Sequence, residues 1–331
     1  HRKPTYRPNS IQAVIIKSSN SGKRIRMDRT IAISTLVKFQ IRLIMLKKLF
    51  QVHNPKGVVG LNRRNIEFIY PHNERKYYTL ADDKVKAKMI LHENDIACAE
   101  TYAVIERISQ IKSVWTGLQE YGALVIKPSK GCGGDGIKIL KKNKLSQWST
   151  SGKHITDAQV FQHITSIISG LYSMSSNDVC LIEECIVPHP FFAEIYDEGV
   201  PDFRIITLKG KPLMAMLRMP TSKSDGKANL HQKGVGIGVD MGYGTLTQVY
   251  DGKKYSNHHP DNATQVNGKK IPYWFTMVQL AKKTAEAFPL EYLGIDLVID
   301  KVKGPQIMEV NVRPGLGIQL VNKCGLQSTL S

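Results

Sequence analysis

The sequence has little cysteine, and none of it is arranged to bind a metal. Five cysteines stand at positions 98, 132, 180, 185 and 324 of 331 residues. None belongs to a Cys-x-x-Cys pair, and an odd, sparse set favours a reducing cytosol over a disulfide-linked scaffold. We therefore expect a cytoplasmic protein without a disulfide framework.

An uncharged apolar run of membrane-spanning length is also lacking. The most apolar stretch, residues 31–50, is broken by Lys38, Arg42, Lys47 and Lys48, which argues against a membrane span. We interpret it as a packed or partner-facing helix, and a helix lying on a membrane surface is the alternative. We also find no cleavable signal peptide and no internal repeat.

Acidic residues are scarce at the N-terminus. Residues 1–50 hold twelve Lys or Arg and one acid, Asp28, a charge of +11, so the other residues contribute only +7 of the total +18. Because the excess is local, it does not indicate a nucleic-acid partner. The basic segment could instead dock on a membrane or a protein. Met27 could be the natural start, with residues 1–26 as added or upstream sequence, or those residues could be native.

From residue 82 on, the pattern predicts helices mixed with hairpins. Helices are expected at 82–94, 158–171 and 274–288, a polar loop at 141–153, and strands at 123–127, 137–140, 179–186, 203–208, 213–219, 293–299 and 306–312. Turn signals at 209–212 and 301–304 join the last two strand pairs as hairpins. We therefore expect an α+β fold rather than a doubly wound parallel sheet.

A glycine-rich loop, Gly131-Cys132-Gly133-Gly134-Asp135-Gly136, lies between two predicted strands. A dinucleotide fingerprint would open a helix, and a Walker loop would continue with Lys-Ser/Thr; neither occurs here. HRD and DFG, which accompany the kinase glycine loop, are missing too. The loop is expected to be a flap whose backbone N–H groups approach phosphate, with Lys127 nearby. A tight hairpin without a ligand is the alternative.

Two carboxylates are predicted to face each other across the last hairpin. If residues 301–304 form its loop, Asp300 faces Pro305 and Asp296 falls opposite Glu309, with Asn311 on the same side. Opposed carboxylates repel unless a cation lies between them, and oxygen-only ligands indicate Mg²⁺ or Mn²⁺. Two solvent-facing acids on an exposed sheet face are the alternative.

These parts, in this order, resemble the ATP-grasp superfamily over residues 57–322. The motifs that carry the resemblance are Asp83-Lys84, Val125-Ile126-Lys127-Pro128 with the flap, Leu181-Ile182-Glu183-Glu184-Cys185-Ile186, Asp202-Phe203-Arg204 and Glu309-Val310-Asn311-Val312-Arg313-Pro314-Gly315. Gly60-Leu61-Asn62-Arg63-Arg64-Asn65 and the ending 313–319 are similar to the α-L-glutamate-ligase-related, or sugar-transfer-associated, branch.

The resemblance implies two α+β subdomains that clasp ATP. The expected parts are a basic tail at 1–30, a short helical region at 31–80, a lid subdomain with the flap at 81–182 and a C-terminal subdomain with the metal site at 183–325. Many relatives carry a full α/β domain before the grasp, so a substrate-binding domain is expected to be short or absent. Cys132 also departs from the family, in which Ser or Arg is common at that flap position.

Each matching residue acquires an implied role. Lys84 and Lys127 would contact ATP phosphates, and the flap glycines Gly133, Gly134 and Gly136 would lie over them. The hinge would hold adenine and ribose through Glu183, Glu184 and Ile186. The remaining roles are phosphoryl stabilisation by Arg204, Mg²⁺ binding by Asp296, Glu309 and Asn311, and anchoring of the acid substrate by Arg313.

The implied reaction is an ATP-dependent carboxylate–amine ligation through an acyl phosphate, with a glutamate-like or peptide acid. A kinase without ligation, and a catalytically weak nucleotide-binding or membrane-associated partner protein, are the alternatives. Arg218 is a further candidate. Around a two-residue Lys209-Gly210 turn, Arg204 pairs with Ala215, so only a bulge or a longer loop brings Arg218 to the same side. For His231, a loop histidine and a site residue remain equally open.

Overall fold

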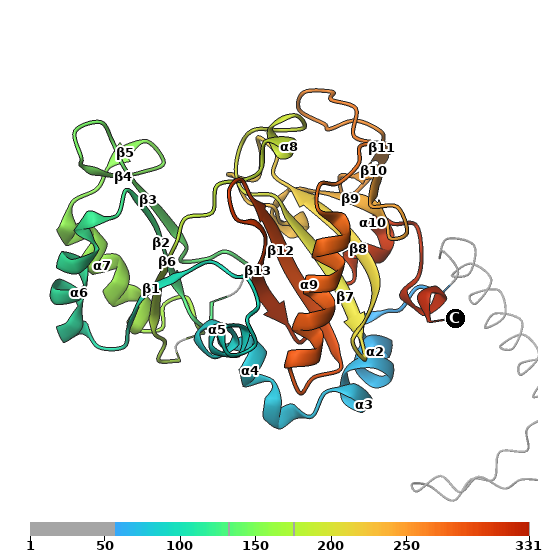
Figure 1. Ribbon diagram of the computed structural model, residues 1–331, viewed down its shortest axis with the longest axis horizontal. Coiled ribbons are helices and arrows are strands. Elements are labelled where there is room, and N and C mark those ends of the chain that lie inside the picture. Colours follow the sequence, from blue (N-terminus) through green and yellow to red (C-terminus); the bar gives the residue numbers. More distant parts are fainter. Residues whose placement is uncertain (1–56, 132, 175, 331) are drawn as a thin grey trace, which may run out of the picture. The chain divides into compact units, whose positions relative to one another are not determined.

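The computed structural model describes residues 57–131, 133–174 and 176–330. The expectations for the tail at 1–30, the apolar helix at 31–50, the start at Met27 and Cys132 lie outside these residues. Within them, Figure 1 shows two groups of strands, one built from residues 101–183 and the other from residues 202–311.

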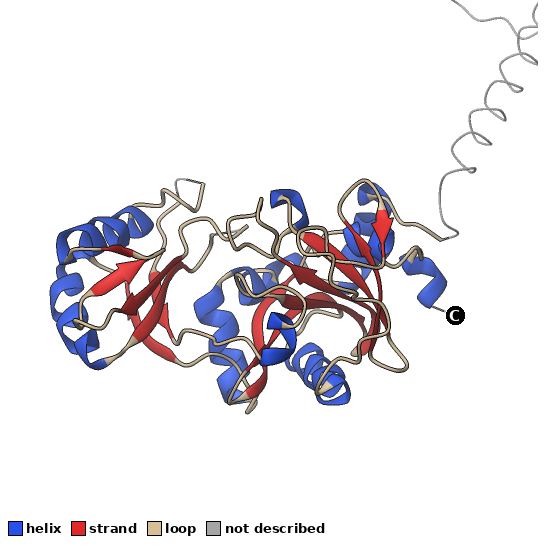
Figure 2. Ribbon diagram, turned by 90° about the horizontal axis from the view of Figure 1, so that it is seen from above, coloured by secondary structure: helices blue, strands red, loops and turns tan. Residues whose placement is uncertain are grey.

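The first sheet has six strands in the order β1-β6-β2-β3-β4-β5, and neighbouring strands are antiparallel. Its strands are β1 (Thr101–Ile105), β2 (Ala123–Pro128), β3 (Lys138–Lys142), β4 (Trp148–Thr150), β5 (Lys153–His154) and β6 (Cys180–Glu183). Helices α6 (Ile111–Gly117) and α7 (Asp157–Ile168) pack on one side of it (Figure 2). Their apolar residues and those of β2 form one core cluster, including Trp115, Leu124 and Ile164.

The second sheet has seven strands in the order β11-β10-β9-β8-β7-β12-β13, again antiparallel. They are β7 (Asp202–Leu208), β8 (Lys211–Met219), β9 (Val235–Asp240), β10 (Thr245–Tyr250), β11 (Tyr255–Ser256), β12 (Tyr292–Asp300) and β13 (Gly304–Asn311). The long helix α9 (Trp274–Ala287) packs on β7, β8, β12 and β13, and it buries Trp274, Met277 and Ala281 in the larger core cluster.

Shorter helices complete the described part of the chain. A helical segment precedes the first sheet and comprises α2 (Leu61–Arg64), the π-helix η1 (Asn65–Ile69), α3 (Tyr70–His72), η2 (Arg75–Tyr77), α4 (Thr79–Asp82) and α5 (Lys84–Glu93). The others are η3 (Ile108–Gln110), η4 (Leu118–Glu120), α8 (Pro190–Ala193), η5 (Leu230–Gln232), α10 (Gly317–Val321) and η6 (Leu326–Thr329). None of the described helices is long and apolar enough to cross a membrane.

The structure confirms the α+β fold and both hairpins, but the sequence prediction was wrong at 141–153 and missed the strands β1, β9, β10 and β11. The expected polar loop at 141–153 is wrong, because Trp148 is buried and β4 and β5 extend the first sheet. The glycine-rich stretch after residue 234 forms the strand β9, although glycines are usually unfavourable inside a strand. A side chain at Gly236 would place its Cβ 2.4 Å from Val321, so the glycine there permits close packing under α10 and does not interrupt the strand.

Candidate active site

A row of polar side chains crosses three neighbouring strands of the seven-stranded sheet. Arg204 on β7 is paired with Asp296 on β12, and Asp296 is paired with Glu309 on β13. Directly paired residues on adjacent strands point to the same face. The predicted opposition of Asp296 and Glu309 is therefore confirmed.

The pairing arises in a different way from the one predicted. Gly304, not Pro305, faces Asp300, so the turn is one residue tighter than expected. That register alone would bring Met308 opposite Asp296. A bulge between the Asp296 and Leu297 pairs leaves Met308 as the extra residue and restores Glu309 to the position opposite Asp296. The two deviations cancel, because each shifts the register by one residue.

A bulge also decides the position of Arg218. The two-residue turn of the β7–β8 hairpin is as expected, with Leu208 opposite Lys211. However, Thr207 pairs with Pro212 and Ile206 with Met214, so one extra residue enters β8. Arg204 consequently faces Met216 rather than Ala215, and this corrects the expected pairing. Arg218 is two residues beyond Met216, the residue paired with Arg204, so its side chain lies on the same face of the sheet as that of Arg204.

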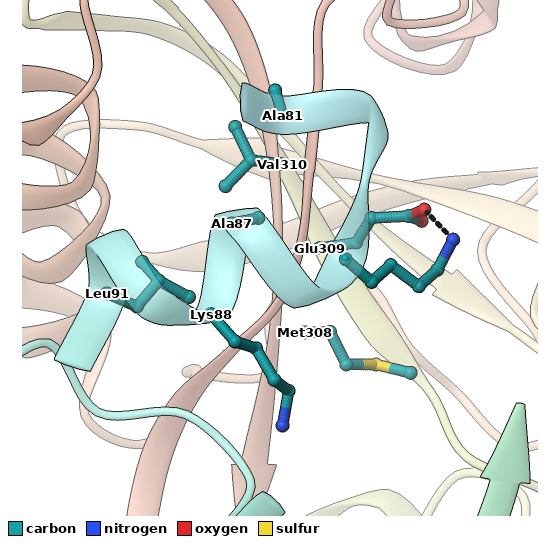
Figure 3. A pocket seen from close by; sticks show the side chains of 8 residues that line it. Ala81, Ala87, Lys88, Leu91, Met308, Glu309 and Val310 are labelled. Atoms are coloured by element: carbon teal, nitrogen blue, oxygen red, sulfur yellow. Dashed lines mark ion pairs between the residues drawn. The ribbon is translucent and has the colours of Figure 1, made fainter. Parts of the chain in front are cut away.

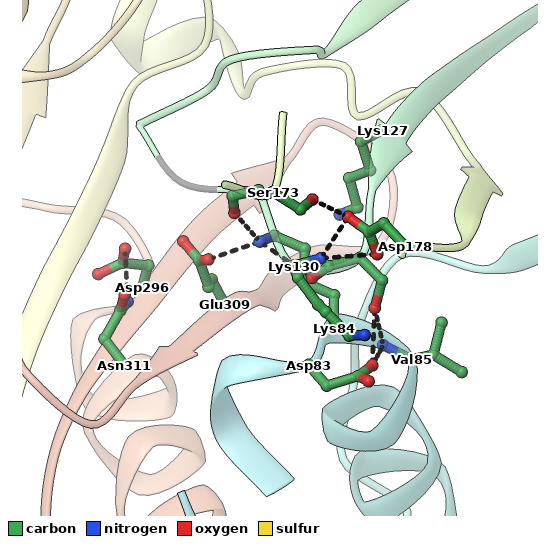
Figure 4. Close-up of polar contacts among 12 residues, drawn as sticks. Asp83, Lys84, Val85, Lys127, Lys130, Ser173, Asp178, Asp296, Glu309 and Asn311 are labelled. Carbon is green, nitrogen blue, oxygen red and sulfur yellow. Dashed lines mark hydrogen bonds and ion pairs between the residues drawn. The ribbon is translucent and has the colours of Figure 1, made fainter. Parts of the chain in front are cut away.

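Two arginines and two acids form a buried ion network on this face. Arg204 donates to both oxygens of Asp296, at 2.8 and 2.6 Å. Arg218 donates to both oxygens of Asp202 at 2.5 Å and to Asp296 at 2.9 Å. The amide of Asn311 donates to Asp296 at 3.2 Å (Figure 4). Asp296 is only 3% exposed, so its charge depends on these partners.

The titration of the two acids follows from this arrangement. Burial alone would raise the pKa of Asp296, but Arg204 and Arg218 outweigh it and hold the pKa below its ordinary value. Burial raises the pKa of Asp202 to about 6 despite the opposing pull of Arg218, and Asp296 adds to the rise. Both carboxylates are thus ionised at neutral pH, and the four charges balance.

Glu309 contacts the N-terminus of α5. Its Oε1 lies 3.0 Å from Nζ of Lys84, which also donates to the carbonyl of Gly131 at 2.7 Å. Asp83 caps α5 and accepts a hydrogen bond from the Ser129 hydroxyl at 2.6 Å. The Asp-Lys motif therefore joins the base of the flap to the metal-site candidate Glu309.

Beside this ion pair, α5 and β13 enclose a small cavity (Figure 3). Lys88, one turn after Lys84, lines it together with Met308 and Glu309.

A second buried ion cluster lies in the six-stranded sheet. Lys127 on β2 forms an ion pair with Glu183 on β6, and Lys88 approaches the other oxygen of Glu183 at 2.6 Å. All three are 6% exposed. The pKa of Lys127 is lowered by burial and by Lys88, although Glu183 opposes the shift. Two ammonium groups against one carboxylate leave a net positive charge, which suits an anionic ligand.

Sequence reasoning missed Lys88. Its spacing of four from Lys84 in a predicted helix places both side chains on one face, and that signal could have found it. Glu183 was expected at the nucleotide hinge. The structure turns its carboxylate toward the two lysines, so it holds these cations in position.

The flap joins β2 to β3, as predicted, and its glycines adopt left-handed backbone. Gly133, Gly134 and Gly136 have φ of +67°, +80° and +77°, which favours glycine over other residues. Asp135, between them, lies 3.8 Å from Nζ of Lys227, in the loop after β8. The flap thus faces a loop of the seven-stranded sheet.

The segment after β6 links the two sheets at the expected hinge. Glu184 lies 2.6 Å from Nζ of Lys303 in the β12–β13 turn, and Val187 donates its N–H to Asp300 at 2.9 Å. Among the described residues the N–H of Ile186 has no hydrogen-bond partner. A free backbone donor at this place could serve a ligand ring.

The structure does not bring Arg313 and His231 into the Asp296 network. The Arg313 guanidinium lies 4.8 Å from the ring centroid of Tyr78 and 3.6 Å from Asp82, next to the helical segment. The ring of His231 is exposed on η5, with no partner among the described residues.

The donor set can be tested against a divalent cation. No cluster of three His, Cys, Asp or Glu side chains occurs in the described part of the chain. Asp296 and Glu309 are nevertheless cross-strand neighbours, and Asn311, whose amide N–H donates to Asp296, carries a further oxygen on the same side chain. Three hard oxygen donors fit Mg²⁺ or Mn²⁺. Arg204, Arg218 and Lys84 neutralise the same carboxylates here.

Comparison with known proteins agrees with this architecture. The chain belongs to the sugar-transfer associated ATP-grasp family, whose model matches residues 63–331, and so to the ATP-grasp superfamily that the motifs resemble. A search of curated proteins found no match.

Similar solved structures include D-alanine–D-alanine ligase from Bacillus anthracis, at 16% identity and a TM-score of 0.40, over 72% of this chain and 58% of that chain. Biotin carboxylase from Campylobacter jejuni has 14% identity and a TM-score of 0.47, over 74% of this chain and 43% of that chain. D-alanyl-alanine synthetase A from Vibrio cholerae has 13% identity and a TM-score of 0.44, over 76% of this chain and 62% of that chain. The chain thus spans less than two thirds of each of these proteins.

Proposed function

We propose that this chain binds Mg-ATP and transfers its γ-phosphoryl group to a substrate carboxylate. One carboxylate oxygen attacks the γ-phosphorus, the bond to ADP breaks, and an acyl phosphate forms. An amine then attacks the acyl carbon and phosphate leaves, so that ATP, acid and amine become amide, ADP and phosphate. A thiol is a less favoured nucleophile, and the acid is glutamate-like or a peptide.

The observation that carries the proposal is the row of Arg204, Asp296 and Glu309 across β7, β12 and β13, with Lys84 in contact with both Glu309 and the base of the flap. Phosphoryl transfer requires positioned cations around the phosphates more than it requires covalent chemistry. Arg204 at one end of the row and Lys84 beside the other end are such cations, and Lys84 also contacts Gly131 at the base of the flap.

The residues divide into three tasks. Lys84, Lys127 and the previously unassigned Lys88 neutralise phosphates under the flap glycines. Arg204, with Arg218 beside it, stabilises the transferring group. Asp296, Glu309 and Asn311 would hold Mg²⁺, which when bound supplies charge neutralisation on the phosphate oxygens.

The hinge is proposed to bind the nucleoside. The free N–H of Ile186 is suited to an adenine ring nitrogen, and Glu184 is the acid for the ribose. Glu183 acts through Lys88 and Lys127, which it holds in position.

The test is ADP release measured over pairs of acids and amines, with product masses. Release that requires both partners, with an amide product, supports ligation. A phosphorylated product formed with one acceptor alone would establish a kinase instead. Mg-ATP binding without any turnover across the screen would indicate a binding protein.

A further inference from the structure

A pocket lies outside the Asp296 network, between the helical segment and Arg313. It measures about 390 Å³, within the range of small-molecule sites. Its lining comes from η1, α3, η2, Tyr78 and Arg313, which follows β13 in the chain.

Hydrogen-bond donors dominate this pocket. The Arg75 side chain is exposed and has no partner among the described residues. Arg313 stacks on Tyr78 and remains 52% exposed. Asn65 accepts from Arg64 through its carbonyl oxygen, which leaves the amide N–H groups available. The only acid in the lining, Glu74, already pairs with Lys76 at 2.7 Å.

The walls are held in place before any ligand arrives. Arg64 is buried and donates to the carbonyl of Pro314 at 3.0 Å, which fixes the turn that follows Arg313. Asn73 exchanges two hydrogen bonds with the backbone of Tyr292, at 2.7 and 2.9 Å. The wall itself includes the π-helix η1, a geometry often found at functional sites.

The pocket adjoins the proposed reaction centre. Arg313 is two residues beyond Asn311, so their Cα atoms lie at most ~7 Å apart. Asp82, 3.6 Å from Arg313, is two residues before Lys84, which pairs with Glu309 at 3.0 Å. A ligand held by Arg313 would therefore lie near the Lys84–Glu309 pair, although Arg313 itself is outside the Asp296 network.

We propose that this pocket binds the acid substrate, a small carboxylic acid between an amino acid and a monosaccharide in size, through the guanidinium groups of Arg75 and Arg313. Planar guanidinium forks match carboxylates. That the ligand is the reacting acid rests on the proposed function. The helical segment would thereby contribute directly to binding of the acid.

The test uses the full chain without nucleotide and malonate as the probe. Calorimetry should detect malonate binding but no binding of malonamide, its neutral counterpart. Arg75→Gln, an exposed change, should weaken malonate binding about tenfold, as expected for one charged hydrogen bond. Arg107→Gln, at an exposed arginine of the six-stranded sheet region, should leave it unchanged.

Equal malonate affinity in the wild type and Arg75→Gln, or no malonate binding at all, would overturn the assignment. Tighter binding of inorganic phosphate than of malonate would also overturn it in favour of a phosphate site. Mg-AMPPNP binding, measured separately, distinguishes this from failure of the proposed function: a chain that binds malonate at Arg75 but not Mg-AMPPNP has the pocket without the nucleotide site.

Discussion

At the residue scale, the charge environment of Asp296 differs most from the one that the sequence suggested. Opposed carboxylates repel each other, and with that repulsion alone the removal of one would cost little stability or even raise it. The structure gives each carboxylate its own cation, with two arginines on Asp296 and Lys84 on Glu309. The repulsion is thereby offset, and the consequence of mutation changes sign.

Asp296→Asn should therefore destabilise the protein by about 3 kcal/mol, because it leaves two largely buried arginines short of a counter-charge. Turnover with Mg-ATP should fall at least about a hundredfold. Urea unfolding and ATP turnover measure the two effects, and Asp197→Asn, on an exposed loop, is the control. Undiminished Mg²⁺-dependent turnover in Asp296→Asn would contradict the site.

At the element scale, the flap depends on its glycines in unequal ways. A side chain at Gly136 would place its Cβ 2.6 Å from the Tyr172 ring, whereas nothing lies within 4 Å at Gly152, which has a similar φ of +74°. Substitution strains the backbone at both positions, but only Gly136 adds a clash at the flap.

Mg-AMPPNP is expected to protect residues 131–140 from hydrogen exchange, because nucleotide contacts would order the flap backbone. Gly136→Ala should lose much of this protection and weaken nucleotide binding, while Gly152→Ala should keep both. Exchange that stays the same when nucleotide is demonstrably bound would refute the flap assignment.

Helix α7 supports the flap through a buried histidine. His163 donates from Nε2 to the carbonyl of Gly136 at 3.0 Å. Burial, with Lys138 nearby, lowers the pKa of His163 below its ordinary value, although the hydrogen bond to Gly136 opposes the shift. The neutral ring is therefore the form present in the folded protein near neutral pH.

Because the unfolded chain protonates this ring at a higher pH than the folded protein does, stability should decline as pH falls below ~6.5. His163→Gln keeps a donor but does not titrate, so it should reduce this decline. Urea midpoints at pH 7 and pH 5 provide the comparison, with the exposed His154→Gln as control. Identical pH dependence in wild type and His163→Gln would contradict the assignment.

At the scale of the whole molecule, the two sheets meet through charged groups. Lys84 joins the flap base to Glu309, and Glu184 joins the end of β6 to Lys303. A nucleotide bound among these groups would contact both sheets, so it should stabilise residues from both against unfolding.

Mg-AMPPNP at 100 times its Kd should raise the free energy of unfolding by about 2.7 kcal/mol. Lys127→Met should shrink that gain at the same concentration, because it removes one of the ammonium groups for the phosphates. It should also cost some stability without ligand, since Lys127 is buried against Glu183. Thermal unfolding checks both, with the exposed Lys112→Met as control. An unchanged gain in Lys127→Met would make Lys127 a structural lysine.

The sequence by itself determined the α+β class, the flap between two strands and the spaced motifs of the family, because turn residues and apolar periodicity are local signals. It also placed Asp296 opposite Glu309, but through a loop and a register that both differ from the real ones. Only the tertiary structure decided the two bulges, which put Arg218 and Glu309 on the face of Arg204 and Asp296. A bulge depends on how neighbouring strands pack, and one extra residue reverses every side chain beyond it. The position of Arg313 against Tyr78 was decided in the same way, by helices more than 230 residues earlier in the chain.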